Sequence, residues 1–593
     1  MKRSHVFAAG AAATTLVALA IAAQGTPPGH EVARVGDAAQ WAEYDADTPK
    51  SIVELQPFRR SSAIAVDTAG SVHLTVTLTN LNPQINAWFL LILHATGEAG
   101  TRSYHIENIQ PQTQVLALDQ SYPDGLRITS SGRTANCALW PEGQPTVLDR
   151  ARQSGLPDAP ICNDRLYLRN ATTGTYTNIE RITNVLRDHV WGGDKIIGFI
   201  KDDFFKDAFI ERGTSGPSGT PRAAASEIDG PMPASLNDVF GAVSIHPETL
   251  AIALESNSAA LPLGRWNPVR DAPGIFLSAM EPQATASVLL GSYKQSVNTL
   301  DSVEAGAVDY LVALDLSQFD LAFALGTDHP RVGWSIRTLD SMRNPRLPGP
   351  DGIGSVAPLI LNGIVSPSWV GRTVAAFAGG FKREHGAFHF GALAVKNSGS
   401  HYGFIEEGVI FSKLQPGLAT LMVTDTGAVQ MKTWTRADDA SLEHIKYARQ
   451  NGVPLIETDA ATGLSRPGAW VNQWGPGNWS GSNDERLRTV RAGMCLQEAG
   501  KTTYLIFGYF STATPSAMVR VFQPYGCRYA MHLDMNALEH TYFALYTKKD
   551  GTVSVQHLIA GMAEVDRKGP GQIAPRFLSF PDDRDFFYLV RKR

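Results

Sequence analysis

The stretch RAGMCLQEAGKTTYLIFGYF, from Arg491 to Phe510, decides the fold of this chain. Two apolar runs with strand composition flank Glu498–Lys501, which predicts two strands joined by a turn. Thr514 and Pro515 then supply an N-cap and a proline for the first helical position, and Gly526 is a natural residue to follow a helix end. The apolar run after it predicts another strand, so this region is expected to form a βαβ-type unit.

The strand after this helix, CRYAMHLDM from Cys527 to Met535, carries polar side chains to its carboxyl end. Asp534 lies near that end, where α/β sheets bind ligands, and Asn536 and His540 follow it. A carboxylate in an apolar run is costly unless it is paired or used. The group predicts a general base, an acid or a metal ligand, with a buried hydrogen-bond network as the open alternative. By strand alternation, His532 is expected to share the face of Asp534.

A second cluster lies in FAGGFKREHGAFHFG, from Phe377 to Gly391. Gly379 and Gly380 follow an apolar strand, and paired glycines allow a sharp turn and a close approach to a ligand. Lys382 and His385 come directly after, as candidates for holding an anion and for transferring a proton. A hairpin turn with solvated charges is the alternative interpretation.

A third cluster is the arginine run RLRTVRAGMC, in which Arg486, Arg488 and Arg491 lead into a strand. A guanidinium fork suits a phosphate or a carboxylate through two parallel hydrogen bonds. A run of surface arginines is equally compatible with this spacing.

Taken in order, these clusters resemble the phosphodiester glycosidase family, and a bacterial branch of it, over roughly residues 305 to 565. The family's Asn-Gly-Gly-Phe turn is similar to Gly379–Phe381, with Ala378 in place of the asparagine. Its strand arginine corresponds to Arg491, and its Leu-Asp pair to Leu533–Asp534. Met535–Leu538 stands where the family has Gly-Gly-Gly-Ser.

The resemblance implies an activity. The family removes a sugar from a phosphodiester by cutting at the anomeric carbon. The mechanism that we predict for such a reaction has Asp534 attack that carbon or activate water. Arg491 and Lys382 would stabilise the leaving phosphate, and His385 and His540 would transfer protons.

Composition excludes several classes of protein. The 593 residues are 43% hydrophobic and 18% charged, as in a globular protein. The formal net charge of -5, without a long basic tract, argues against nucleic acid as a partner. No cofactor is expected, and a divalent cation held by Asp534 and Asn536 stays open as an alternative.

The N-terminus predicts export. Lys2 and Arg3 precede the uncharged run Val6–Ala23, and Ala20–Ala22 has the small-x-small pattern that signal peptidases cut after. We therefore predict a signal peptide over residues 1–23, with an uncleaved anchor as the alternative. No later apolar run is long enough to span a membrane, so the expected location is periplasmic or extracellular.

The four cysteines fit an oxidising compartment, where disulfides persist. They fall into two neighbourhoods, which predicts the pairs Cys137–Cys162 and Cys495–Cys527 as the simplest of three connectivities. A catalytic cysteine or a zinc site is the alternative, although no CxxC spacing is present.

The expected fold class is α+β or mixed α/β. Alternation in SVHLTVTLTN predicts strands early in the chain, and Asp439–Gly452 has the spacing of an amphipathic helix. The predicted organisation after the signal peptide is a β-rich, sandwich-like domain with a helical end (30–211), a Gly/Ser/Pro-rich linker (212–235), a connecting region (236–304) and a mixed-sheet, phosphodiester-glycosidase-like domain (305–593).

The function predicted from these observations is that of an exported hydrolase of glycosyl phosphodiesters or related envelope or extracellular glycan linkages. Its partner would be a carbohydrate or a sugar-phosphate polymer. Two alternatives stay open. One is a glycan-binding or envelope-assembly protein that keeps the fold without catalysis, and the other is a metal-dependent hydrolase.

Overall fold

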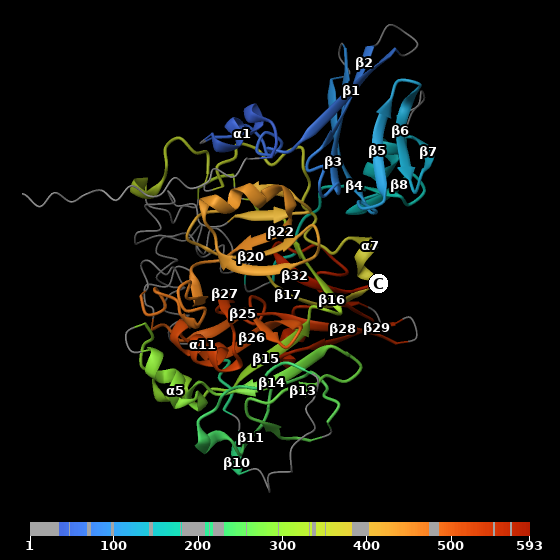
Figure 1. Cartoon of the computed structure of the whole chain (residues 1–593). Coiled ribbons are helices and arrows are strands. Elements are labelled where there is room, and N and C mark those ends of the chain that lie inside the picture. The colour runs from blue at the N-terminus through green and yellow to red at the C-terminus, as the bar shows by residue number, and fades with distance from the viewer. Residues whose placement is uncertain are drawn as a thin grey trace, which may run out of the picture. The chain divides into compact units, whose positions relative to one another are not determined.

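Antiparallel β-sheets build this protein, as the computed structural model shows (Figure 1). The prediction of an α+β or mixed α/β fold is wrong, because the chain is strongly β-rich and has several antiparallel sheets. The structure describes residues 35–46, 48–67, 73–96, 100–140, 146–177, 180, 208–212, 214–217, 230–256, 258–293, 296–330, 332–334, 340–349, 351–381, 403–473, 486–549, 552–569 and 572–593.

The largest sheet has eight strands in the order β13-β14-β15-β26-β25-β27-β23-β24. Its middle strands are highly apolar and buried on both faces. The strands are β13 (Asn267–Pro268), β14 (Ile275–Met280), β15 (Asp309–Asp315), β23 (Pro454–Thr458), β24 (Ser465–Pro467), β25 (Thr489–Ala499), β26 (Thr502–Ala513) and β27 (Tyr529–Met535).

The predicted strand–helix–strand unit is confirmed, with a third strand inserted. Helix α11 (Pro515–Phe522) begins after Thr514, whose side chain accepts a hydrogen bond from the Ala517 amide, and the turn after it ends at Gly526 with a φ of 72°. Strands β26 and β27 both pair antiparallel with β25. They therefore run parallel to each other with β25 between them, and α11 crosses over it.

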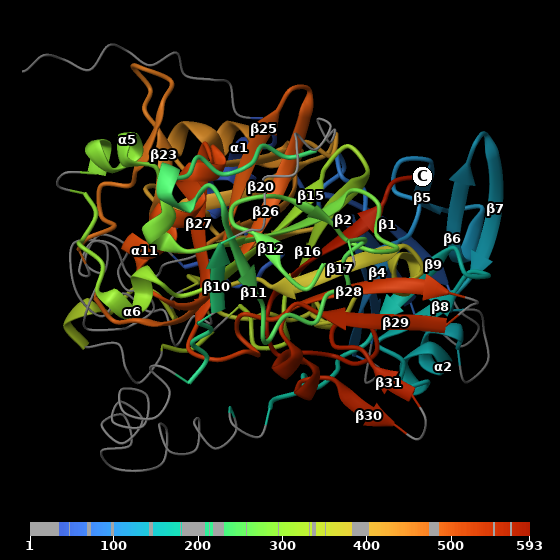
Figure 2. The ribbon, with the colours of Figure 1, turned by 90° about the horizontal axis from the view of Figure 1, so that it is seen from below.

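A five-stranded sheet, β16-β32-β17-β28-β29, packs against the large sheet. Phe377 of β17 lies 5.1 Å from Phe507 of β26 and 5.4 Å from Phe587 of β32, measured between ring centroids. These rings join the two sheets into one core, and Figure 2 shows β17, β28 and β29 side by side. The strands are β16 (Phe319–Ala324), β17 (Thr373–Ala378), β28 (Phe543–Lys549), β29 (Thr552–His557) and β32 (Phe586–Arg591).

A second five-stranded sheet has the order β19-β18-β22-β20-β21. Here the helix predicted over Asp439–Gly452 is wrong. A 3-10 helix covers Arg436–His444, and Ile445–Gln450 forms the strand β22 between β18 and β20. Tertiary pairing has overridden a weak helical pattern. The other strands are β18 (Phe404–Glu406), β19 (Val409–Ser412), β20 (Ala419–Thr424) and β21 (Val429–Thr433).

The N-terminal strands, coloured blue to teal in Figure 1, form a six-stranded sheet β1-β2-β3-β4-β9-β8 and a three-stranded sheet β5-β6-β7 that share one core. Helix α1 (Ala38–Asp45) precedes them, and α2 (Val147–Gln153) lies between β7 and β8. The strands are β1 (Arg60–Asp67), β2 (His73–Asn80), β3 (Trp88–Ala95), β4 (Thr101–Asn108), β5 (Gln114–Asp119), β6 (Tyr122–Ser130), β7 (Arg133–Ala138), β8 (Asp158–Ile161) and β9 (Leu166–Arg169).

Smaller elements complete the described structure. They are the sheet β10-β11-β12 (Thr214–Pro217, Val243–His246, Leu261–Pro262), the pair β30-β31 (Arg567–Gly569, Gln572–Ala574) and the short helices α5 (Ser287–Leu290), α6 (Ser302–Ala305) and α7 (Pro367–Val370). In the part of the chain that is described, no helix has the length and apolar character needed to cross a membrane.

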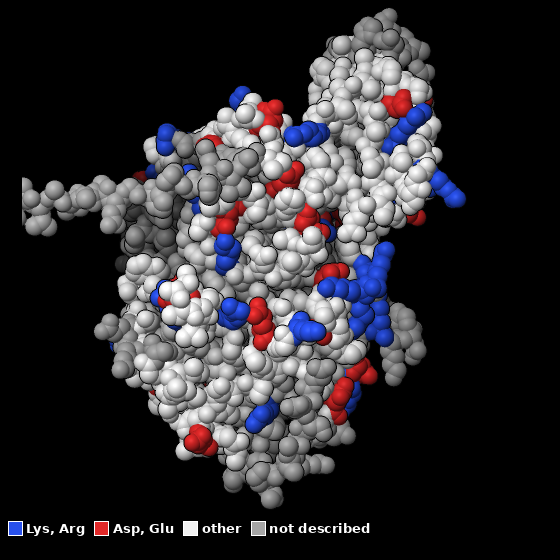
Figure 3. Space-filling model, viewed as in Figure 1, with Lys and Arg blue, Asp and Glu red and all other residues white. Residues whose placement is uncertain are grey.

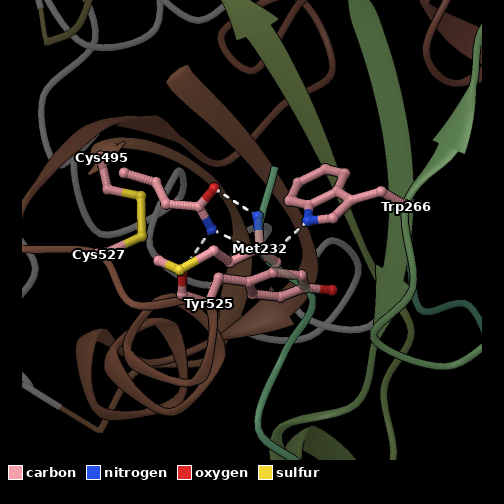
Figure 4. Close-up of a disulfide and its surroundings, with 6 residues drawn as sticks. Met232, Trp266, Cys495, Tyr525 and Cys527 are labelled. Atoms are coloured by element: carbon pink, nitrogen blue, oxygen red, sulfur yellow. Dashed lines mark hydrogen bonds between the residues drawn. A yellow bond between two sulfur atoms is a disulfide. The ribbon is translucent and has the colours of Figure 1, made fainter. Parts of the chain in front are cut away.

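Both predicted disulfides, Cys137–Cys162 and Cys495–Cys527, are confirmed. The second lies beside the docking point of the segment that contains Met232 (Figure 4). The Gln497 amide there donates to the carbonyl oxygens of Met232 and Tyr525, and the Met232 main-chain N–H donates back to it at 2.9 Å. The Trp266 indole donates to the Met232 carbonyl oxygen at 2.7 Å. These bonds hold the last residues of the predicted linker (212–235) against β25.

Several predictions fall on residues outside the described part. They are the signal peptide over 1–23, most of the linker over 212–235, and the site residues Lys382 and His385. The predicted domain boundaries stay predictions.

Candidate functional site

A bulge at the end of β27 sets the direction of Asp534. Arg491 of β25 pairs with Met535 and Gly493 pairs with His532, so one extra residue of β27 is accommodated between the two pairs. Such a bulge redirects side chains out of strict alternation. The prediction that His532 shares the face of Asp534 is therefore wrong. His532 lies against the Phe381 ring at 4.8 Å and 3.4 Å from the Arg491 guanidinium, whereas Asp534 points to another partner.

Asp534 makes a buried ion pair with Arg584. The Arg584 Nη1 donates to Asp534 Oδ2 at 2.8 Å, and the Met535 main-chain N–H donates to Oδ1 at 2.8 Å. Only 5% of Asp534 is exposed. Burial raises the pKa of Asp534 to about 6, against the opposing effect of Arg584. A carboxyl group with this pKa exchanges its proton near neutral pH, as a general acid or base must.

Arg584 connects Asp534 to two further side chains. Its Nε donates to Glu180 Oε1 at 2.7 Å, and its Nη2 lies 2.7 Å from His540 Nε2. Burial lowers the pKa of Arg584, but the carboxylates of Glu180 and Asp534 outweigh this effect and the net shift is upward. The guanidinium therefore stays charged and fixes the geometry of all three neighbours.

The contacts of His540 define one tautomer of its imidazole. Nδ1 lies 2.8 Å from the carbonyl oxygen of Met535, which can only accept, so Nδ1 carries the proton. Nε2 faces Arg584, which can only donate, so Nε2 presents its lone pair. Glu539 Oε1 lies 3.6 Å from the same nitrogen. His540 is thus oriented from both sides next to Asp534.

Asn536 supports the turn that follows β27. Its φ is 82°, in the left-handed region that asparagine tolerates better than most residues. Its main-chain N–H donates to the Val490 carbonyl oxygen at 2.9 Å, and its Oδ1 accepts from the Thr489 hydroxyl at 3.2 Å. The side chain is tied to β25, so the described contacts give Asn536 a positioning role.

The Gly379-Gly380 turn is held next to Asp585 and the end of β27 by hydrogen bonds. The Gly379 N–H donates to the Asp585 carbonyl oxygen at 2.7 Å, and the Phe381 N–H donates to Asn451 Oδ1 at 3.2 Å. Asn451 Nδ2 donates in turn to the Leu533 carbonyl oxygen at 2.5 Å, inside the bulge. One asparagine therefore connects the glycine turn to the strand end that carries Asp534.

We expect the substitution Gly380→Ala to lower the free energy of unfolding by about 1 to 3 kcal/mol. Gly380 has a φ of 135°, and an added Cβ would lie 2.9 Å from Asn451 Oδ1. Urea denaturation measures the effect. Gly500→Ala is the matched control, because Gly500 has a φ of 61° but open space around an added Cβ. Equal losses in the two variants would contradict the close contact with Asn451.

Arg491 lies in the interior between β25, β26 and the bulge. Its Nε donates to the Ala513 carbonyl oxygen at 2.7 Å and its Nη2 to the Leu487 carbonyl oxygen at 3.0 Å. Burial lowers the pKa of Arg491 to about 9, with Glu304 opposing this effect. Of the other arginines in the run, Arg488 pairs with Asp301 at 2.7 Å. Phosphate binding by Arg491 stays a prediction.

The structure adds site residues that the sequence analysis missed. The segment Pro581–Asp585 has three aspartates and an arginine, all at most 2% exposed, directly before the apolar strand β32. Arg576 pairs with Asp582 at 2.7 Å, and Arg449 lies 3.0 Å from Asp585. The sequence does contain a signal for these residues. Charged side chains stand directly beside an apolar, aromatic run, and Asp534 was predicted because it is a carboxylate in such a run. Among the described residues, no group of three or more His, Cys, Asp or Glu side chains could hold a metal ion.

Comparison with known proteins gives little guidance. No model of a protein family matches the chain, and no curated protein matches it. One solved structure that resembles it is the catalytic domain of zebrafish N-acetylglucosamine-1-phosphodiester alpha-N-acetylglucosaminidase, auto-inhibited by its pro-peptide. The match has 10% identity, covers 62% of this chain and 96% of that chain, and has a TM-score of 0.28. A likeness this weak carries no conclusion about fold or function.

Proposed function

We propose that this protein is an exported hydrolase that cleaves glycosyl phosphodiesters, or related glycan linkages, at the anomeric carbon. The observation that carries the proposal is the group formed by Asp534, Arg584 and His540 at the end of β27. It combines a carboxyl group that titrates near neutral pH with an oriented imidazole and a permanent cation. Carboxylates of this kind serve glycoside hydrolysis as nucleophile or base.

The proposed reaction divides the work among these residues. Asp534 attacks the anomeric carbon or activates a water molecule, and Arg584 stabilises its ionised form. The leaving phosphate is already acidic, so its departure needs charge stabilisation more than full protonation. Arg491 and Lys382 are the residues proposed for that role, and His385 and His540 for proton transfer. No cofactor enters the proposal.

A second candidate is a glycan-binding or envelope-assembly protein without catalysis. The observation that favours it is the mutual pairing of the charged groups. Asp534 and Glu180 both lie against Arg584, and all three are nearly fully buried. Buried networks of this kind also occur for purely structural reasons.

The test is turnover of a substrate panel by the purified protein. We expect hydrolysis of nucleotide sugars, measured as release of reducing sugar, with an unchanged rate after dialysis against EDTA. A p-nitrophenyl glycoside, which lacks the phosphodiester, is the matched control and should react at least about tenfold more slowly, because its leaving group carries no phosphate charge for the site to stabilise. Binding of the sugars without turnover of any panel member would favour the second candidate.

A further inference from the structure

Positively charged side chains gather at one end of the five-stranded sheet that contains β17, β28 and β32. We call this group the basic edge, and its members are Arg372, Lys446, Lys548, Arg591, Lys592 and Arg593. Figure 3 shows a concentration of blue atoms there, beside the place where Figure 1 marks α7 and the C-terminal end. It stands out in a chain whose formal net charge is -5.

Main-chain contacts hold the basic edge together. The Arg372 Nη1 donates to the Arg591 carbonyl oxygen at 3.0 Å, and the Arg591 N–H donates to the Arg372 carbonyl oxygen at 3.0 Å. Lys548 Nζ donates to the Gly371 carbonyl oxygen at 2.6 Å. The ends of neighbouring strands therefore place Arg372, Lys548 and Arg591.

Few acids neutralise the basic edge. Glu407 lies 3.4 Å from Lys446, and Asp320 lies 3.9 Å from Lys592. In the described part of the chain, no carboxylate makes an ion pair with Arg372, Lys548 or Arg593. Six cations against two paired acids leave a surplus that complements an anionic partner.

An aromatic side chain lies within the same surface. Trp369 of α7 has the Arg372 guanidinium 4.9 Å from its ring centroid and the Lys446 ammonium group 5.6 Å from it. The indole is partly exposed, so it adds a flat apolar face between charges. A chain of sugar rings that carry acid groups offers the matching combination of apolar ring faces and negative charges.

The basic edge and the candidate site occupy opposite ends of the same strands. Arg584 precedes β32, Gly379 follows β17 and His540 precedes β28, whereas the basic edge lies at the other end of each. Strand β17 has six residues, so the two ends lie about 20 Å apart. A ligand on the basic edge therefore leaves the site itself uncovered.

We propose that the basic edge binds an acidic polysaccharide through its carboxylate or phosphate groups and so holds the protein on an anionic glycan. The choice of a glycan over other polyanions rests on the proposed function. An anionic membrane is less well matched, because Trp369, the aromatic side chain beside the basic edge, is only partly exposed. Membrane-surface proteins insert exposed apolar side chains.

The test compares two triple variants in binding to polygalacturonate. Lys548→Glu/Lys592→Glu/Arg593→Glu alters the basic edge. Lys501→Glu/Arg466→Glu/Arg528→Glu changes the net charge equally at exposed positions outside it. We expect the first to weaken binding about 10- to 100-fold at low salt and the second by less than about twofold. Thermal unfolding checks both folds, and Lys548→Gln/Arg593→Gln replaces the first triple if it unfolds.

Several outcomes would overturn the basic edge as a glycan site. They are equal losses in both triples, equal binding to neutral dextran, or tighter binding to duplex DNA or to phosphatidylglycerol vesicles than to polygalacturonate. The variant Asp534→Asn should still bind polygalacturonate, and the basic-edge variant should turn over small substrates at the wild-type rate. If the protein turns over small substrates but does not bind polygalacturonate through the basic edge, only this proposal fails. If it binds polygalacturonate but turns over no substrate, only the proposed hydrolysis fails.

Discussion

Replacing Asp534 by asparagine is expected to lower kcat/KM for the phosphodiester substrate at least about 1000-fold while the protein stays folded. Asparagine keeps the shape of the side chain and still accepts a hydrogen bond from Arg584, but it cannot act as a nucleophile or base. Reducing-sugar release measures the rate, and circular dichroism checks the fold. In the wild-type protein, the ionised form of Asp534 should support a rate that rises with pH through about 6, the pKa that burial produces.

Glu180→Gln is the matched control for this variant. Glu180 is the other carboxylate that contacts Arg584, with its Oε1 2.6 Å from Nη2. Both substitutions remove one negative charge from the same guanidinium, so both should change stability by a similar amount. We expect Glu180→Gln to retain most of the activity. A fully active Asp534→Asn variant, or equal loss in the two variants, would contradict the catalytic role of Asp534.

Replacing Arg584 by methionine is expected to lower the free energy of unfolding by about 3 to 5 kcal/mol. Arg584 is 1% exposed and pairs with both Glu180 and Asp534. Methionine has a similar length but no charge, so two buried carboxylates would lose their common partner. Removing one partner of a buried ion pair costs far more than the net contribution of the pair, because the remaining charges stay desolvated. Urea denaturation measures the change.

Two further variants test whether unpaired buried carboxylates cause the loss of stability in Arg584→Met. Arg466→Met removes an arginine that is 56% exposed and pairs with Asp459 at 2.8 Å, and it should cost less than about 1 kcal/mol. The triple variant Glu180→Gln/Asp534→Asn/Arg584→Met removes the stranded charges as well, so it should be more stable than Arg584→Met alone. If the triple variant were less stable than the single one, unpaired carboxylates would not explain the loss.

The elements that local sequence determines were the ones predicted well. The turn between β25 and β26, the cap at Thr514 and the end at Gly526 each depend on a few neighbouring residues. The region 439–452 shows the opposite case. Its apolar spacing fits a helix, but pairing with β18 and β20 stabilises the extended form of β22. That pairing involves residues distant in sequence, so a local pattern does not show it.

In the candidate site, too, the residues with a local signal were predicted and those that depend on tertiary contacts were missed. Asp534 and His540 were predicted because they stand out within one apolar run. Arg584 and Glu180 were missed, although Arg584 contacts both residues and Glu180 is 404 positions away from it. The Gly379-Gly380 turn was recognised as a site element, whereas its link to Asn451 depends on a contact between separate sheets.

The sequence by itself determined the strands near Asp534, the helix α11 and a carboxylate with an unusual position. It also favoured both cysteine pairs as the simplest of three connectivities. These follow from propensity, capping and spacing, which act over a few residues. Only the tertiary structure decided that the sheets are antiparallel, that a bulge turns Asp534 away from His532, and that Arg584 pairs with Asp534. The reason is physical, because burial and ion pairing depend on residues that folding alone brings together.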